Sequence, residues 1–208
     1  MLSIFMFPSL SFESDVETNV KTVVITSWVD LESFNEKLQK LKRIGVDAIF
    51  RDVEWHAVEQ QRGIFDWDHH IGCVEAIAGA GLLCILQISA QFVPTWVWRS
   101  YPDAKFVNEF NETSEQYMSF WHPQTKPLIQ RYYSEFFTAF RDYSETIYGI
   151  YVSAGMWSEL IYPWIPEEQK FAYWGYDVYA KADFTFYKVC SFKEYVCWNY
   201  SISAFKLS

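Results

Sequence analysis

The stretch Val23–Val53, with the sequence VVITSWVDLESFNEKLQKLKRIGVDAIFRDV, decides the fold class of this chain. Its first part, Val23–Trp28, is rich in β-branched residues and predicts a buried strand. From Leu31 to Ile44 the apolar residues recur every three or four positions, which predicts an amphipathic helix that ends at Gly45. Val46–Val53 predicts a second strand. A strand, a helix and a strand joined by short turns indicate a parallel βαβ unit.

The same alternation continues toward the C-terminus. The further predicted elements are the helix His69–Ala80 with Asp68 as its cap and Gly81 at its end, the strand Leu82–Ile88, the helix Lys126–Tyr143 and the strand Ile147–Ser153. Two stretches, Glu54–Trp67 and Ser89–Pro123, are predicted as loops, and the second is long and irregular. A long loop in a compact domain usually carries function. Four such units predict an α/β fold that forms part of a (β/α)8 TIM barrel.

The sequence divides into three predicted regions. Residues 1–20 form an N-terminal extension, residues 21–183 form the N-terminal half of the barrel, and residues 184–208 form an irregular, aberrant tail. A helix over Phe171–Phe184 is expected just before that tail. The apolar Met1–Phe12 lacks basic residues and a small-residue cleavage site, so the location stays open, with the cytoplasm slightly favoured over secretion.

Composition excludes several classes of protein. The 208 residues contain 26 acidic and 17 basic side chains, which gives a net charge of −9. That charge argues against a nucleic-acid partner and against binding to anionic membranes. Half of the residues are hydrophobic, yet no apolar run is long enough to cross a membrane. The four cysteines and four histidines lack the spacing of metal ligands, so neither a metal nor a cofactor is predicted.

Polar and aromatic side chains follow the predicted strands. In a β/α barrel, residues just beyond the C-terminal ends of the strands form the active site. Carboxylates bind hydroxyl groups and tryptophans stack on sugar rings, so this set predicts a carbohydrate partner, an oligo- or polysaccharide. The candidate substrate-binding residues are Trp28, Asp52, Glu54, Trp55, Trp96 and Trp157.

Four of these residues form two pairs, and each pair has two interpretations. Asp52 and Glu54 share one face of their strand and form either a sugar-hydroxyl clamp or a salt-bridged patch. Trp55 and Trp96 either stack on sugar or close the mouth of the barrel. Arg51 lies on the opposite face of the strand, which directs its side chain toward the helix layer.

Glu159 is the candidate catalytic residue. It lies between Trp157 and Tyr162 and follows the predicted strand Ile147–Ser153. Aromatic surroundings raise the pKa of a glutamate by desolvation and allow it to donate a proton near neutral pH. The alternative is a surface glutamate that merely follows the strand.

Three segments carry a resemblance to known families. Val46–Asp68 resembles the region after the second strand of retaining (β/α)8 glycoside hydrolases of the β-galactosidase kind (family 42-like), with Trp55, Glu59 and Gly63 at the matching W-x-x-x-E-x-x-x-G positions. The segment PTWVWRSYPDA (Pro94–Ala104) is similar to the third-strand segment of the same family. The segment GIYVSAGMWSELIYP resembles the G-x-x-G-E-L-R-Y-P motif of β-amylases (family 14-like).

The resemblance implies hydrolysis of O-glycosyl bonds. It assigns Glu159 as the general acid/base and Asp52 as a residue that holds the sugar at the cleavage subsite. Glycoside hydrolysis needs two carboxyl groups, and these families place the second after the seventh strand. Too few residues follow Glu159 for four more units, so we expect a chain truncated before that carboxylate and inactive alone. The alternatives are a non-catalytic carbohydrate-binding half-barrel or an inactive fragment that associates through open sheet edges.

Overall fold

A computed structural model of the chain describes residues 4–5, 20–26, 31–153, 164–165, 170–171 and 173–187. The chain is divided into two compact units. The first unit comprises residues 1–53, 66–87 and 139–151. The second unit comprises residues 54–65, 88–138 and 152–208.

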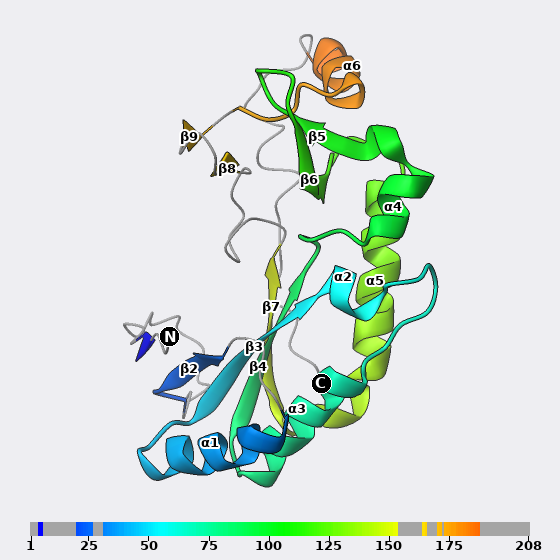
Figure 1. Cartoon of the computed structure of the whole chain (residues 1–208). Helices are drawn as coiled ribbons and strands as arrows, with labels where there is room; N and C mark the ends of the chain where they lie inside the picture. The colour runs from blue at the N-terminus through cyan, green and yellow to red at the C-terminus, as the bar shows by residue number, and fades with distance from the viewer. Residues whose placement is uncertain are drawn as a thin grey trace. The chain divides into compact units, whose positions relative to one another are not determined.

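The first unit is built on a sheet with the strand order β1-β2-β3-β4-β7 (Figure 1). β2 pairs in parallel with β3, with Val23 opposite Ala48, and β1 pairs antiparallel with β2. β3, β4 and β7 point the same way in Figure 1. The predicted series of parallel strands is therefore confirmed. The strands are β1 (Ile4–Phe5), β2 (Val23–Thr26), β3 (Ala48–Glu54), β4 (Leu83–Ser89) and β7 (Ile147–Ser153).

Two helices of the first unit, α1 (Leu31–Arg43) and α3 (Asp68–Gly79), contact each other beside the sheet. The apolar face predicted for α1 is buried, because Phe34 and Leu38 have no exposed surface. α1 is followed by Gly45, whose φ of +87° is a conformation that glycine adopts without strain. The sequence therefore placed this helix and its end correctly.

The prediction that Asp68 caps α3 is wrong. The N-cap is Trp67, and Asp68 is the first helical residue. The backbone N–H of Asp68 donates a hydrogen bond of 3.1 Å to Oδ1 of Asp66. Asp68 nevertheless places a negative charge in the first turn, where the helix dipole favours it.

The second unit contains short elements in the stretches that were predicted as loops. The prediction of one long irregular stretch is wrong, because it contains two helical segments and a hairpin. The carboxamide oxygen of Asn108 accepts the N–H groups of Phe110 and Glu112 and so closes the hairpin turn. The short hairpin strands contain polar residues, so they lack the apolar runs that signal a strand. These short elements are α2 (Trp55–Val58), α4 (Thr95–Ser100), η1 (Pro102–Ala104), β5 (Lys105–Val107) and β6 (Thr113–Met118). The longer helix α5 (Thr125–Ala139), which the sequence predicted, follows them.

Residues 173–177 extend this hairpin before the last helix begins. The N–H groups of Gly175 and Tyr176 donate to the carbonyl of Val107, so the segment lies beside β5. The helix predicted over Phe171–Phe184 begins later, as α6 (Val178–Tyr187). Asp177 sets its start, because its carboxylate accepts the N–H groups of Tyr179 and Ala180.

The remaining short elements complete the described chain. α5 ends at Ala139 rather than at the predicted Tyr143, and a 3₁₀ turn, η2 (Arg141–Tyr143), follows it. β8 (Trp164–Ile165) pairs antiparallel with β9 (Lys170–Phe171). Among the helices that the structure describes, none has the length and apolar character needed to span a bilayer.

Candidate functional site

The structure describes four of the residues predicted for the site. Asp52 belongs to the first unit, and Glu54, Trp55 and Trp96 belong to the second. The predicted acid Glu159 and the tryptophans Trp28 and Trp157 lie outside the described residues.

The side chains of β3 alternate between two faces of the sheet in the first unit. Arg51 is buried, with its Cζ 5.7 Å from the centroid of the Phe34 ring of α1, and it donates a 3.5 Å hydrogen bond to the Cys73 thiol of α3. The prediction that Arg51 faces the helices is therefore confirmed. Asp52 lies on the opposite face together with Phe50, whose ring centroid is 6.0 Å from that of Tyr151 on β7. In a β/α barrel this face lines the interior.

Titratable groups of α3 and β4 near Arg51 have shifted pKa values. Burial, together with the Arg51 charge, lowers the pKa of His70 from 6.5 to about 4. Burial also raises the pKa of Cys73 and raises that of Cys84 to about 12. These groups are neutral near pH 7, as a buried environment beside a cation requires. No group of three or more potential metal ligands occurs within the described ranges.

In the second unit, Glu59 is the centre of a hydrogen-bond cluster that the sequence analysis did not assign to the site. Its side chain has no exposed surface. The indole Nε1 of Trp55 donates to Oε2 of Glu59 at 2.7 Å, and the backbone N–H of Gly63 donates to Oε1 at 2.6 Å. Trp55 and Gly63 are each four residues from Glu59, so the W-x-x-x-E-x-x-x-G spacing brings both donors to one buried carboxylate. That spacing is the feature of the sequence from which the role of Glu59 could have been recognised.

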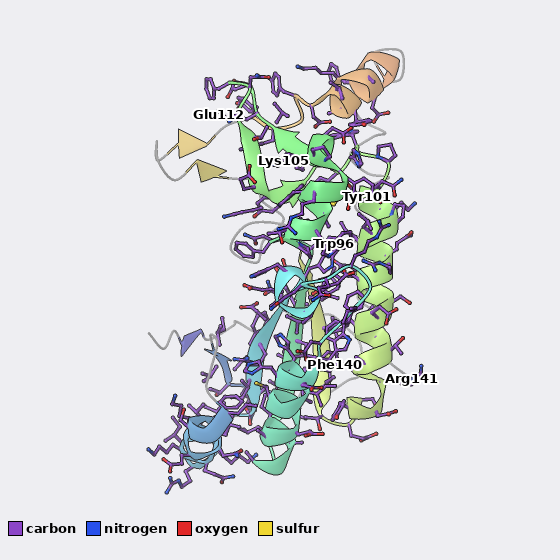
Figure 2. All side chains as sticks on the ribbon, turned by 45° about the vertical axis from the view of Figure 1, so that its right-hand side comes forward. Trp96, Tyr101, Lys105, Glu112, Phe140 and Arg141 are labelled. Atoms are coloured by element: carbon purple, nitrogen blue, oxygen red, sulfur yellow. The ribbon has the colours of Figure 1, made fainter. Side chains whose placement is uncertain are left out.

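Arg131 of α5 supplies the positive charge of this cluster. Its guanidinium forms an ion pair with Oε1 of Glu59 and lies 5.3 Å from the ring centroid of Phe65. The indole Nε1 of Trp96 donates to the backbone carbonyl of Glu59 at 3.1 Å. Both figures show α4 beside α5, and Trp96 is labelled in Figure 2. We name the set Trp55, Glu59, Gly63, Trp96 and Arg131 the Glu59 cluster.

Burial favours the packing alternative for the two tryptophans. Trp55 is fully buried and stacks on Tyr132, with the ring centroids 5.4 Å apart and the planes 10° apart. Trp96 is 8% exposed and meets Trp55 edge-on at 6.3 Å. Glu54, by contrast, has a side chain that is 41% exposed, with a carboxylate oxygen 3.6 Å from Nδ1 of His56. Glu54 therefore has a polar neighbour in His56 and remains accessible to a ligand.

The parallel β/α units and the carboxylate on the inner face of β3 define the class of the protein, an α/β protein with part of a (β/α)8 barrel. The chain belongs to the glycoside hydrolase family Glyco_hydro_42, described as "Beta-galactosidase", whose model matches residues 25–145. The predicted fold class and the predicted likeness to glycoside hydrolases are therefore confirmed.

Curated β-amylases are also similar to the chain. The thermophilic β-amylase of Thermoanaerobacterium thermosulfurigenes is 26% identical over 77% of this chain and 32% of that protein. The β-amylase of Niallia circulans is 31% identical over 67% of this chain and 26% of that protein. The chain thus spans about a third of the length of the curated relatives it matches.

Solved structures give the same picture. The catalytic domain of the β-amylase from Paenibacillus polymyxa matches with a TM-score of 0.73 and 27% identity, over 83% of this chain and 48% of that chain. The β-galactosidase of the psychrophilic Marinomonas ef1 matches with a TM-score of 0.56 and 16% identity, over 67% of this chain and 22% of that chain. At 16% identity, the match to the Marinomonas ef1 enzyme shows a similar fold alone.

Proposed function

We propose that this protein is a glycoside hydrolase that cleaves O-glycosyl bonds of carbohydrates, with Glu159 as the general acid/base. The observation that carries the proposal is the family match over residues 25–145. That segment includes β3, which presents Asp52 on the face away from the helices. The assignment of Glu159 as the general acid/base is based on its aromatic neighbours in the sequence and on the resemblance to β-amylases.

The proposed roles follow from the chemistry of glycoside cleavage. A protonated carboxyl group donates to the leaving oxygen, so an aromatic environment that raises the pKa of Glu159 suits the acid. In this proposal Asp52 binds hydroxyl groups of the sugar, and the accessible Glu54 adds a second acceptor. Trp28 and Trp157 are the proposed stacking surfaces, since Trp55 and Trp96 are engaged in the Glu59 cluster.

The bond that is cleaved has two candidates. A β-galactosidase-like specificity is our first proposal, supported by the family match. A β-amylase-like specificity is the second, supported by the 27% identity and TM-score of 0.73 with the Paenibacillus polymyxa domain. Turnover of an aryl β-galactoside and of an α-glucan by the same preparation separates the two.

The acid role is tested with Glu159→Gln in a full-length version that supplies the second carboxylate. We expect this variant to lose activity on natural glycosides, whose leaving groups need a proton, and to keep most of its activity on a dinitrophenyl glycoside, whose leaving group does not. Glu36→Gln, a change at an exposed position of α1, is the matched control and should behave as the wild type. Equal losses on both substrates would refute the acid role. Sugar binding without turnover of either substrate by the wild type would favour the non-catalytic alternative.

A further inference from the structure

Arg62 lies at the accessible side of the Glu59 cluster. Its Cζ lies 5.5 Å from the ring centroid of Trp96 and 6.0 Å from that of Tyr101. Its Nη2 donates a 3.3 Å hydrogen bond to the hydroxyl of Tyr101. Arg62 is exposed, and Tyr101 is half-buried. Two rings and one hydrogen bond therefore hold this guanidinium at the surface.

The charges around Trp96 do not balance. Arg131 also lies 5.5 Å from the Trp96 ring, so two guanidinium groups approach one indole. The cluster holds a single carboxylate, that of Glu59, and it already accepts from Trp55, Gly63 and Arg131. Arg62 takes part in neither the Arg131–Glu59 nor the Lys105–Glu115 ion pair. The site thus carries an excess positive charge in a chain of net charge −9.

A stacked arginine suits a planar oxyanion. The guanidinium group carries five N–H donors in a fixed plane, and only one bond of Arg62 is assigned, to Tyr101. The two rings hold the guanidinium group, and its N–H groups other than the one bonded to Tyr101 can donate paired hydrogen bonds to a carboxylate. Because the side chain is already ordered by Trp96 and Tyr101, binding loses less side-chain entropy than at a mobile arginine.

We propose that Arg62 and Tyr101 bind the carboxylate of an acidic sugar, a uronic acid residue within the carbohydrate substrate. The inference rests on the proposed function, because that function supplies the sugar. Arg62 contributes charge and paired N–H donors, and the partly exposed ring of Tyr101 contributes an apolar surface for the sugar ring. The site gives the protein a preference for acidic over neutral sugars.

The test compares three probes by calorimetric titration of the full chain: galacturonate, galactose and acetate. For the wild type we expect tighter binding of galacturonate than of galactose or acetate. Arg62→Gln should weaken galacturonate binding about five- to tenfold and leave galactose binding unchanged, as expected for the loss of one charge-assisted contact. Arg62→Lys keeps the charge but not the planar fork, and should recover only part of that affinity.

Arg99→Gln is the matched control, since Arg99 is an exposed arginine in the last turn of α4. This variant should bind galacturonate as the wild type does. An equal loss in Arg99→Gln, or no loss in Arg62→Gln, would overturn the inference. Acetate that binds as tightly as galacturonate, or a wild type without preference for galacturonate over galactose, would overturn it as well. A wild type that binds and cleaves no sugar would instead overturn the proposed function.

Discussion

Two arginines, the buried Arg51 of the first unit and the half-buried Arg131 of the second, have different surroundings. Arg51 of the first unit lies over an aromatic ring and donates to a thiol, and the titratable groups near it, His70 and Cys73, are neutral. Arg131 of the second unit is paired with the fully buried carboxylate of Glu59. His70 and Cys73 are neutral beside Arg51, whereas Glu59 forms an ion pair with Arg131. The first unit should therefore be sensitive to acid, and the second to loss of a charge partner.

The largest expected effect is that of Glu59→Gln. The Glu59 carboxylate is fully buried, and an amide in its place removes the charge from three hydrogen bonds, those donated by Trp55, Gly63 and Arg131. From the weakening of these three bonds we expect a loss of about 3 to 5 kcal/mol in the free energy of unfolding. Urea denaturation followed by tryptophan fluorescence measures it, because Trp55 and Trp96 belong to the cluster.

Glu115→Gln is the control for that measurement. Glu115 is 69% exposed and paired with Lys105, so its loss should change the free energy of unfolding by less than about 1 kcal/mol. Similar values for the two glutamates would show that burial does not distinguish the pairs, and the comparison of the two arginines would fail.

The next effect is acid destabilisation through His70. Burial and the Arg51 charge lower its pKa to about 4 in the folded chain, against 6.5 ordinarily. Between those pH values the unfolded chain binds a proton that the folded chain does not, so stability falls as the pH drops from 6.5 to 4. Protonation of His70 should therefore lower the free energy of unfolding by roughly 3 kcal/mol over this pH range.

His70→Leu isolates this contribution. The variant should lose less stability than the wild type between pH 6.5 and pH 4 in urea titrations at a series of pH values. A variant with the same pH dependence as the wild type would show that His70 does not titrate as a buried neutral group.

A smaller effect is expected for Asp177→Ala. The Asp177 carboxylate is buried and accepts only neutral donors, the N–H groups of Tyr179 and Ala180 and the hydroxyl of Ser119. Loss of a helix cap costs about 1 to 2 kcal/mol, which should appear as faster amide exchange in α6. If Asp177→Ala lost as much free energy of unfolding as Glu59→Gln, the ion pair with Arg131 would contribute little to the effect of the Glu59 substitution.

The smallest effect is that of Tyr143→Phe in the first unit. The Tyr143 hydroxyl donates to Oε1 of Glu75 at 2.9 Å, and both groups are exposed. Water replaces such a bond, so the free energy of unfolding should change by less than about 0.5 kcal/mol in urea denaturation. A change above 1 kcal/mol would contradict the view that burial decides the value of these polar contacts.

The regular parts of the fold were predictable because each has its own local signal. The spacing of Phe34 and Leu38 specified the buried face of α1, and Gly45 specified its end. The alternation in β3 placed Arg51 and Asp52 on opposite faces. Both periodicities are properties of the backbone and need no knowledge of the partners.

Other features are set by polar side chains that cap a helix or close a turn and that leave no apolar pattern in the sequence. α6 begins at Val178 because Asp177 caps it, a local signal that the sequence analysis did not use, and Ser119 in turn donates to the Asp177 carboxylate. The hairpin of β5 and β6 is hidden in a polar stretch, because its turn is closed by the side chain of Asn108 rather than by a glycine.

For the candidate site, the sequence alone determined the residue types and the family likeness. It contained the spacing of Trp55, Glu59 and Gly63. It did not show that these residues form a hydrogen-bond cluster, because the charge that stabilises Glu59 comes from Arg131, which is distant in the sequence. Only the tertiary structure showed that Trp55 and Trp96 are packed inside this cluster and that Arg62 remains at its surface. A buried carboxylate needs a specific partner, and the choice of that partner is made by the fold.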